Sequence, residues 1–270
     1  MSRASLAHYL RTLAVVSVGI VTAFFMVEPP ANAQSIDDIV KKGKLTVGVL
    51  IDVPPFGMLT DGKPDGYDPD VAKLMSKYLG VEAEIVPITG PNRIPYLLTN
   101  KVDILIAVFG ITPERAKQVM FSIPYSTIEI QLLAPKKTPI SKMEDTGKLK
   151  VGVARASTQD TALTSLLPKG TQILRFDDDA TAAQAFLSGQ VDALGTNNVI
   201  GPQLAAANPT MEIEKKLVLR SQYQGITVRR GSSDLLQWIN TFLYFIKNNG
   251  ELDAINKKWF NEPLPSMPTF

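Results

Sequence analysis

The sequence predicts an α/β protein of two lobes, each with a mostly parallel sheet flanked by helices. An internal echo supports this prediction: Lys44-Leu-Thr-Val-Gly-Val49 recurs as Lys148-Leu-Lys-Val-Gly-Val153, and Lys101-Val-Asp103 recurs as Gln190-Val-Asp192. Each half therefore begins and ends with the same sequence pattern, and helical patterns lie between its strands. Strands that alternate with helices favour parallel pairing, which places ligand sites at the carboxyl ends of the strands.

In the first half, we expect a helix that Asp68 caps and that stops at Gly80. A second helix is expected to begin at Asn92. Residues 104–109 form a short apolar run, the pattern of a strand that is buried on both faces. The apolar face of the first of these helices consists of Val71, Leu74, Met75 and Tyr78.

The apolar run stops at Gly110, and the three residues Thr112-Pro-Glu114 predict the start of a helix. Thr112 can accept a hydrogen bond from the first turn, and proline fits the first helical position. Arg115 adds a permanent planar cation beside exposed amides, which makes a sensible cradle for a carboxylate. An ordinary strand-to-helix turn with a solvated arginine is the alternative interpretation.

The second half repeats this arrangement, with helical patterns at residues 159–167 and 180–188. Ser157-Thr-Gln159 opens the first of these helices with small and hydroxyl side chains, which leave amides free, although Ser157 is also explained as a plain N-cap. The tail resembles neither half. It predicts a long amphipathic helix from Leu235 to Ile246, ended by Asn248-Asn-Gly250, and then a shorter helix.

The first 33 residues predict a cleaved signal peptide. Arg3 and Arg11 make a basic start, residues 13–27 are apolar, and Ala31-Asn-Ala33 has the small-x-small pattern of a cleavage site. The apolar run is short for a membrane span. We therefore expect secretion with cleavage after Ala33, and an uncleaved anchor is the alternative.

Composition excludes several kinds of chemistry. The only histidine is His8, inside the expected signal peptide, and the chain has no cysteine. The mature chain therefore lacks the residues for Ser-His-Asp or Cys-His catalysis and for nearly all zinc sites. A formal net charge of +2 provides no excess of positive charge with which to bind the phosphate backbone of a nucleic acid. We expect no metal, no cofactor and no nucleic-acid partner.

Several spaced motifs in this order resemble the polar amino-acid family of periplasmic solute-binding proteins, the capture subunits of ABC importers. The motifs are Gly66-Tyr-Asp-Pro-Asp-Val71, the segment from Asp103 to Arg115, and Phe121-Ser-Ile-Pro-Tyr125. The resemblance covers the chain from about Leu45 to Phe260. It implies a type II periplasmic-binding-protein fold, in which two hinge strands join the lobes and the tail packs on the first lobe.

The resemblance also implies lobe boundaries. Lobe 1 is expected to comprise residues 34–134 and 224–270, and lobe 2 residues 135–223. The two crossovers between the lobes are expected near 132–137 and 221–228. Such a double connection permits hinge closure about a cleft.

The implied function is capture of a small amino-acid-like solute by a monomer that is free in the periplasm, followed by delivery to the membrane subunits of an ABC importer. No catalysis is expected. A ligand held by Arg115 from one lobe and Thr158 from the other is fully contacted only when the cleft shuts, so binding would drive closure. The residues that we predict to bind the ligand are Val53, Phe56, Arg93, Val108, Gly110, Thr112, Arg115, Ser157, Thr158, Gln159 and Asn197.

Three positions depart from the pattern of the family. Asn197 stands where an aspartate usually pairs with the ligand ammonium, and hydrogen bonds to charged groups contribute about 1.5–3 kcal/mol against about 1 for neutral ones. Val53 replaces an aromatic lid, and Gly90 stands near the position of its partner. Phe56, Phe109 and Tyr125 are possible substitutes for the missing aromatic contact, with a place in the core or the wall as the plainer interpretation of each.

Asn92-Arg-Ile-Pro95 resembles the segment of acidic-amino-acid binders, in which the arginine meets a second carboxylate through bidentate pairing. Those binders usually carry another arginine at the position of Leu50. The sequence thus slightly favours an acidic or dicarboxylate ligand, with a solvated Arg93 as the plain alternative.

Two other functions fit the same fold. One is a dehydratase-like enzyme that acts on cyclohexadienyl acids such as arogenate, which would need a poised carboxylic acid in the cleft, and no such residue stands out. The other is a soluble ligand-sensing partner of a membrane receptor. The sequence does not separate sensing from transport, because the partner surfaces have no recognisable motif.

Overall fold

The structure is a computed structural model that describes residues 33–268. The strands in this part of the chain are β1 (Lys44–Leu50), β2 (Met58–Thr60), β3 (Lys63–Asp65), β4 (Glu82–Ile88), β5 (Ile104–Leu105), β6 (Val119–Pro135), β7 (Lys150–Ala154), β8 (Gln172–Phe176), β9 (Ala193–Asn197) and β10 (Ile213–Arg229). Eight of them form one sheet in the order β4-β1-β5-β10-β6-β9-β7-β8, and β2 and β3 form a separate hairpin. Pairing is parallel within β4-β1-β5 and within β9-β7-β8, and antiparallel where β10 and β6 join them.

The α-helices of the described residues are α1 (Ile36–Lys42), α2 (Tyr67–Leu79), α3 (Arg93–Leu98), α4 (Pro113–Ala116), α5 (Thr158–Leu166), α6 (Asp179–Leu187), α7 (Ile200–Ala207), α8 (Ser233–Asn248) and α9 (Glu251–Phe260). Short 3-10 helices occur at Met143–Lys148 and Pro209–Met211. No helix among residues 33–268 is both long enough and apolar enough to span a membrane. The expected signal peptide lies outside the described residues, apart from Ala33.

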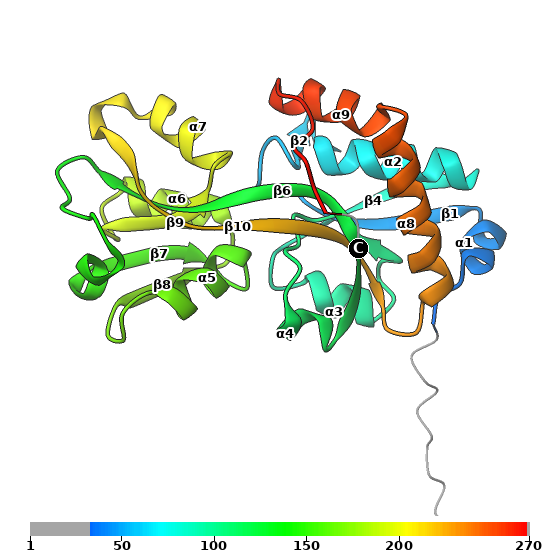
Figure 1. Ribbon diagram of the computed structural model, residues 1–270, viewed down its shortest axis with the longest axis horizontal. Coiled ribbons are helices and arrows are strands. Elements are labelled where there is room, and N and C mark those ends of the chain that lie inside the picture. The colour runs from blue at the N-terminus through cyan, green and yellow to red at the C-terminus, as the bar shows by residue number, and fades with distance from the viewer. Residues whose placement is uncertain (1–32, 269–270) are drawn as a thin grey trace, which may run out of the picture. The chain divides into compact units, whose positions relative to one another are not determined.

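We call the part built on β4, β1 and β5 the first lobe and the part built on β9, β7 and β8 the second lobe. The strands β6 and β10 pair with each other and run side by side from one lobe to the other (Figure 1). This architecture confirms the predicted two-lobed α/β fold. The expected crossovers fall at the end of β6 and within β10, and the residue boundaries of the lobes stay a prediction.

Each lobe has a core of its own. In the first lobe, Leu45, Val47 and Val49 of β1 are fully buried in one large cluster. In the second lobe, two smaller clusters cover the two faces of the sheet. Leu163 of α5 packs in one and Phe186 of α6 in the other. Neighbouring residues of β6 alternate between these clusters, as expected for a strand with helices on both sides.

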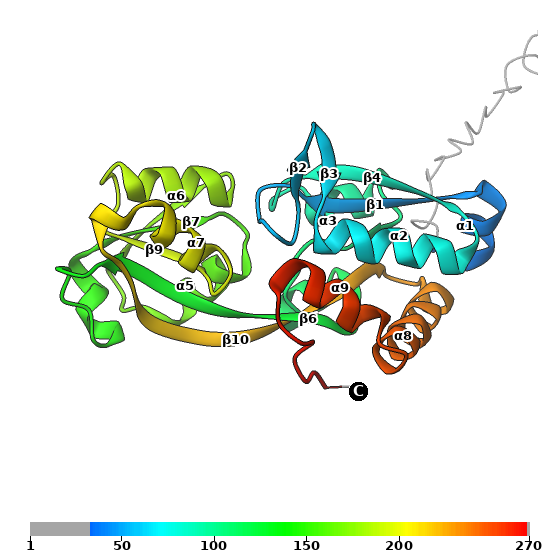
Figure 2. The same cartoon turned by 90° about the horizontal axis from the view of Figure 1, so that it is seen from above.

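The tail returns to the first lobe, as the resemblance implied. The helices α8 and α9 lie beside α2 (Figure 2). The Trp259 indole N–H donates to Asp70 Oδ2 at 2.8 Å, which ties α9 to α2. In α8, the residues Ile239, Leu243 and Ile246 are buried, so the predicted apolar face is the packing face.

Most of the predicted helix ends are confirmed. Thr112 Oγ1 accepts from the Arg115 amide at 3.3 Å, Ser157 Oγ accepts from the Asp160 amide at 3.0 Å, and Gly80 ends α2 in a left-handed conformation with φ of +71°. The predicted cap at Asp68 is wrong, because α2 begins at Tyr67 without a side-chain cap. Asp68 instead lies on the buried face of the helix.

The predicted strand at 104–109 is shorter than expected, because β5 ends at Leu105. Val108 has a φ of +46°, which is unfavourable for a β-branched residue. Its amide points away from the sheet and donates to Asp68 Oδ2 at 3.2 Å and to the Tyr125 hydroxyl oxygen at 3.3 Å. Tertiary partners therefore bend the chain out of the sheet, although residues 106–109 stay buried.

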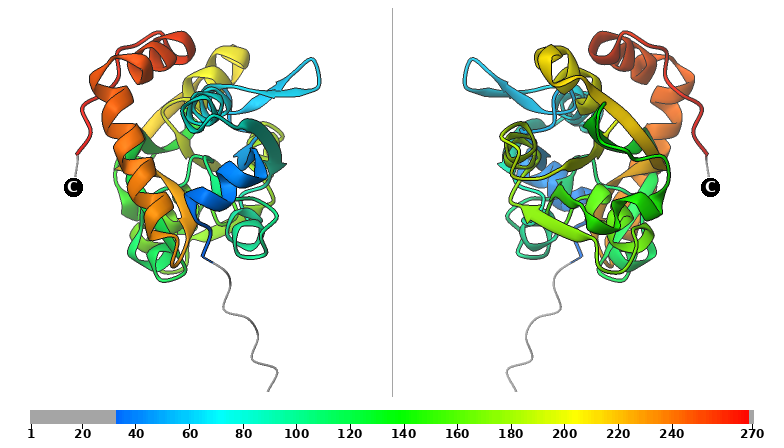
Figure 3. Two further views of the ribbon diagram at one scale, coloured as in Figure 1. Left: turned by 90° about the vertical axis from the view of Figure 1, so that its right-hand side faces the viewer. Right: turned by 90° about the vertical axis from the view of Figure 1, so that its left-hand side faces the viewer.

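Other elements carried no clear signal in the sequence. These are α1, α7 and the β2–β3 hairpin, which stands out beside α2 (Figure 3). The strands β6 and β10 are also far longer than the expected crossovers, with 17 residues each.

Candidate ligand-binding site

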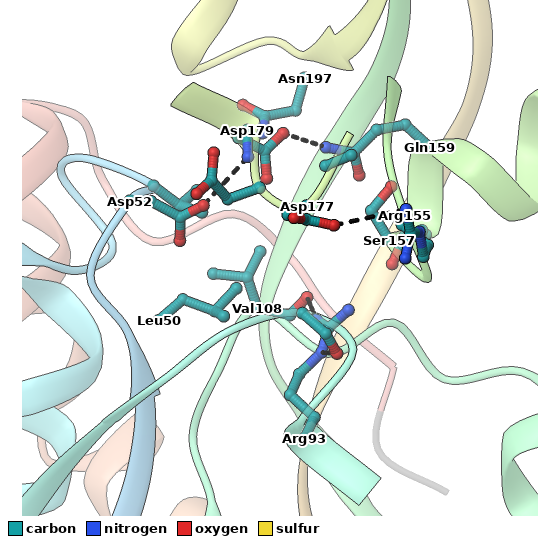
Figure 4. Close-up of a pocket in the computed structure, with 15 residues that line it drawn as sticks. Leu50, Asp52, Arg93, Val108, Arg155, Ser157, Gln159, Asp177, Asp179 and Asn197 are labelled. Atoms are coloured by element: carbon teal, nitrogen blue, oxygen red, sulfur yellow. Dashed lines mark hydrogen bonds and ion pairs between the residues drawn. The ribbon is translucent and has the colours of Figure 1, made fainter. Parts of the chain in front are cut away.

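A small cavity lies between the lobes, beside the carboxyl ends of β1, β7, β8 and β9 (Figure 4). The volume of the cavity is about 20 Å³, which is room for about one water molecule. An amino acid can therefore enter only when the lobes move apart. The predicted site residues that line this cavity are Val53, Arg93, Val108, Ser157, Thr158, Gln159 and Asn197.

Arg115 lies directly behind Thr158 and is only 8% exposed. Its Nη1 donates to the Gly110 carbonyl oxygen at 2.9 Å and to Thr158 Oγ1 at 3.2 Å, and its Nη2 donates to the Ala156 carbonyl oxygen at 3.0 Å. Burial, followed by the neighbouring guanidinium of Arg93, lowers the pKa of Arg115 to about 9, so it remains a cation at neutral pH. Among residues 33–268, no carboxylate oxygen lies within 4.0 Å of it. Arg115 is thus a buried charge without a counter-ion in this part of the chain.

Two arginines of the first lobe converge on one carbonyl of the second. The guanidinium carbons of Arg93 and Arg115 lie 4.4 and 4.3 Å from the ring centre of Phe109, in the range of cation–π contacts. Both side chains donate to the carbonyl oxygen of Ala156, whose left-handed φ is +57°. These bonds connect the lobes directly.

The guanidinium of Arg93 is largely occupied by backbone oxygens. Its Nε donates to Gly90 at 3.1 Å, its Nη1 to Ala107 at 3.1 Å and Val108 at 3.3 Å, and its Nη2 to Ala156 at 2.9 Å. An arginine has five N–H groups, so one remains. A single N–H cannot form a bidentate pair with a carboxylate. This geometry does not support contact with a second ligand carboxylate.

The start of α5 offers free amides to the cavity. Ser157 Oγ caps the Asp160 amide, whereas the backbone N–H groups of Thr158 and Gln159 have no hydrogen-bond partner within residues 33–268. The amino end of a helix carries a partial positive charge. With Arg115 behind Thr158, this end of the cavity suits an anionic group.

Gly110 allows the lobes to approach closely. A Cβ atom at this position would lie 2.6 Å from Thr158 Oγ1 and 2.9 Å from Thr158 Cγ2. Gly110 therefore lies against Thr158 rather than on the cavity wall, and Thr112 caps α4 nearby. Phe56 is not brought to the cavity, because it packs in the first lobe against Tyr67 and Phe260.

Asn197 lies at the cavity but uses its oxygen elsewhere. Its Oδ1 accepts from the amides of Val199 at 2.9 Å and Ile200 at 3.0 Å, which holds the turn into α7. Both acceptor positions of the side-chain oxygen are thereby filled. Asn197 therefore has no acceptor left for a ligand ammonium in this arrangement.

Sequence reasoning missed an acidic group in the same cavity. Asp52 follows β1, and the run Asp177-Asp178-Asp179 follows β8. Asp52 Oδ2 accepts from the Asp179 amide at 3.0 Å. Burial raises the pKa of Asp52, and burial together with Asp52 raises the pKa of Asp179 to about 7. Asp52 follows the strand predicted at residues 44–49, and that placement could have pointed to it, whereas no strand was predicted directly before Asp177.

Comparison with known proteins places these features in a family. Residues 45–262 match the sequence profile of the bacterial extracellular solute-binding proteins, family 3. The chain is 36% identical to the ABC transporter glutamine-binding protein of Bacillus subtilis (strain 168) over 225 residues, or 81% of this chain and 82% of the relative. It is 30% identical to the L-cystine-binding protein of Escherichia coli (strain K12) over 261 residues, or 94% of this chain and 97% of the relative.

Among solved structures, the chain resembles an ancestral amino acid-binding protein that is a precursor of cyclohexadienyl dehydratase. The TM-score is 0.74 at 35% identity, and the match covers 83% of this chain and 99% of the other.

Proposed function

The chain belongs to family 3 of the bacterial extracellular solute-binding proteins, and we propose that it captures an amino acid between its lobes and delivers it to the membrane subunits of an ABC importer. Relatives that bind glutamine and cystine support an amino acid as the ligand. The proposal places the protein in the periplasm as a monomer, after cleavage behind Ala33. A role as a sensing partner of a membrane receptor would use the same capture step.

The observation that carries this proposal is the buried Arg115 guanidinium without a counter-ion among the described residues. A ligand carboxylate at the start of α5 would meet the free amides of Thr158 and Gln159 and lie beside this charge. We assign to Arg115 the electrostatic part of carboxylate binding and to the two amides the direct hydrogen bonds. Gly110 permits the approach of Thr158.

Closure follows from where these groups lie. Arg115 belongs to the first lobe and α5 to the second, so a carboxylate is contacted from both sides only when the lobes meet. A ligand shifts a conformational equilibrium by its difference in affinity for the two states. Capture by closure is therefore the motion that we propose.

The slight preference for an acidic or dicarboxylate ligand is not part of the proposal. Arg93 has one N–H left for a ligand, and acidic side chains gather at the cavity. A second carboxylate would meet repulsion from these acidic side chains and could not form a bidentate pair with Arg93. The glutamine-binding relative reported above takes an amino acid with a single carboxylate.

Arg115→Met tests the proposal, with Arg230→Met as the matched control because Arg230 is exposed and donates only to the Lys117 carbonyl. Ligand-stripped mature protein is titrated calorimetrically with glutamine, cystine and arginine. Because Arg115 acts on the carboxylate through its charge, we expect its loss to weaken binding about tenfold or more, a cost of about 1.4 kcal/mol or above. Equal affinities of Arg115→Met and wild type would contradict the carboxylate site.

One observation favours an enzyme as the second candidate. Asp179 is a carboxylic acid in the cavity whose pKa is raised to about 7, as a general acid for dehydration requires. Incubation with a cyclohexadienyl acid, followed by absorbance of an aromatic product, tests this function. If the wild type turns the acid over and Asp179→Asn does not, catalysis replaces capture as the proposed function. If the wild type shows no turnover, capture remains the proposed function.

A further inference from the structure

We propose that Asp52 and Asp179, one from each lobe, together bind the cationic nitrogen of the captured ligand (Figure 4). The inference rests on the proposed function, because it names the charged group that the amino acid presents opposite its carboxylate. Asp52 stands just beyond β1 in the first lobe, and Asp179 is the first residue of α6 in the second. The pair is therefore assembled only when the lobes are close.

The hydrogen bonds of the pair leave one oxygen of each carboxylate without a partner. Asp52 Oδ2 accepts from the Asp179 amide at 3.0 Å, and Asp179 Oδ1 accepts from Gln159 Nε2 at 2.9 Å. Asp52 Oδ1 and Asp179 Oδ2 have no hydrogen bond to any residue between 33 and 268, and no cationic side chain of that range lies within 4.0 Å of either carboxylate. Two partly buried carboxylates thus face the cavity, and neither has a direct ion-pair partner in the described part of the chain.

Two buried amide side chains at the same cavity point independently to a polar ligand. Asn197 is 1% exposed and Gln159 is 4% exposed. Within the described residues, Asn197 Nδ2 and Gln159 Oε1 have no hydrogen-bond partner, although both side chains line the cavity. These two atoms are open to the cavity rather than sealed in the core, so they are available to a ligand there. A ligand with a protonated nitrogen would supply donors for Gln159 Oε1 and for the free carboxylate oxygens.

The charges around the cavity agree with a cation at this end. Of the two arginines on the cavity wall, Arg93 is committed to backbone carbonyls, and Arg155 pairs with Asp177 at 3.3 Å. The Arg93 guanidinium still acts on Asp52 and Asp179 through its charge, but neither carboxylate has an ion-pair partner within 4.0 Å among residues 33–268. The start of α5 suits an anion, so the cavity has two ends of opposite sign, which is the charge distribution of a zwitterionic amino acid.

The same pair predicts pH-dependent binding. Burial and the neighbouring carboxylates raise the pKa of both groups, that of Asp179 to about 7. The charged groups that face the pair from neighbouring elements are Arg93 on α3 and Asp178 before α6, with the Asp177–Arg155 ion pair at the cavity rim. A bound cation favours the ionised form of both carboxylates, so affinity should fall as the pH drops from 8 to 6.

The cationic nitrogen has two possible sources, the α-ammonium of a neutral amino acid and the side chain of a basic one. Four probes separate them: glutamine, its α-hydroxy analogue, arginine and 4-guanidinobutyrate. The α-hydroxy analogue keeps the carboxylate and the side chain but lacks the ammonium. The compound 4-guanidinobutyrate keeps a carboxylate and a side-chain cation but lacks the α-ammonium.

The experiment titrates these probes calorimetrically into wild type, Asp52→Asn and Asp179→Asn of the mature chain at pH 8 and pH 6. Asp61→Asn is the matched control, because it makes the same change of charge in an exposed residue of the turn between β2 and β3 that does not line the cavity. We expect each of the two cavity variants to weaken the tightest amino acid about tenfold or more at pH 8, and the control to stay within about twofold. Thermal melting without ligand shows that each variant folds.

The outcomes separate this inference from the proposed function. Losses confined to probes with a free α-ammonium assign the pair to that group, and losses that include 4-guanidinobutyrate assign it to the side-chain cation. The inference is overturned if both variants bind every probe as wild type does, or if the α-hydroxy analogue loses as much affinity as glutamine. If binding is lost in Arg115→Met but kept in both aspartate variants, only the acid pair is refuted. If wild type binds no amino acid, the proposed function fails.

Discussion

Gly110→Ala is expected to obstruct closure of the lobes without disturbing their separate folds. Gly110 belongs to the first lobe and lies against Thr158, which opens α5 in the second. A Cβ atom at position 110 would lie 2.6 Å from Thr158 Oγ1 and 2.9 Å from Thr158 Cγ2. Rotation of the threonine side chain cannot relieve the clash, because both branches are too close. The second lobe would have to move back.

The structure gives the size of this effect. Both contacts are shorter than the 3.0 Å below which Cβ atoms are essentially never found, so something must shift. Overpacking of a tight contact costs about 1–3 kcal/mol, which corresponds to roughly 5- to 150-fold weaker ligand binding if the whole cost falls on the closed state. The bond from Arg115 Nη1 to Thr158 Oγ1, now 3.2 Å, would lengthen as well. Both effects act in the same direction.

The assay compares ligand affinity by calorimetry with melting of the ligand-free protein. Gly147→Ala is the matched control, because a Cβ atom there meets nothing within 4 Å. The ligand-free melting temperature also reports any local strain against Gln222, whose Cγ lies 2.9 Å from the added atom. Unchanged affinity in Gly110→Ala, with the same melting temperature, would refute the argument that this contact limits closure.

Three further predictions concern stability. Arg229→Met should lower the free energy of unfolding, measured by urea denaturation, by about 2–5 kcal/mol. Arg229 is 3% exposed, and its loss leaves the carbonyls of Leu97 and Val102 without their donor. A change below about 1 kcal/mol would contradict this prediction. Lys247→Met should stabilise the protein at pH 7, because the Lys247 ammonium has no partner in the described chain and burial lowers its pKa to about 8. The folded state loses this proton before the unfolded state does, so the advantage of the variant should shrink as the pH rises above about 8; an equal advantage at pH 7 and pH 10 would count against the explanation. Burial raises the pKa of Asp68 to about 7, so the folded state binds more protons than the unfolded state between about pH 4 and pH 7, and the Asp68 contribution to stability should fall as the pH rises through that window. Asp68→Asn should remove this slope from urea denaturation series, and an identical slope in variant and wild type would show that Asp68 is not its source.

Local signals in the sequence were sufficient for much of the fold. The echo of residues 44–49 at 148–153 predicted β1 and β7 as the corresponding strands of two lobes. Thr112 and Ser157 each begin a helix, because a hydroxyl oxygen next to the first turn needs no distant partner to act as a cap. Such features depend on residues a few positions apart, so a single sequence contains them.

Features that depend on distant partners were not predictable in this way. Val108 leaves the sheet because its amide bonds to Asp68 and Tyr125, 40 and 17 residues away in the chain. The expected strand and the expected cap at Asp68 failed for this one reason. Each side chain was assigned to its own segment, whereas the fold brings the two segments together.

The candidate site was predictable only in part. Arg115, Thr158 and Gln159 could be proposed as site residues because their segments carry a recognisable pattern of strand, turn and helix. The contact between Asp52 and Asp179 joins residues 127 positions apart in different lobes, and no local pattern connects them. The backbone carbonyls around Arg93 are equally hidden, because every residue has a carbonyl and only the fold decides where it points.

The ribbon formed by β6 and β10 has a mechanical consequence. It is bound to β9 at Ile130–Leu133 and to β5 at Thr227, and the register shifts within the span between these anchors both involve Gly225. A hydrogen-bonded ladder resists sliding of one strand along the other, so rotation of one end must be taken up as bending or twist where the ladder is already irregular. The compliance of the connection is therefore concentrated around one residue without a side chain. The resistance of the connection to bending therefore depends on residues of β6 and β10, and not on the residues that line the cavity.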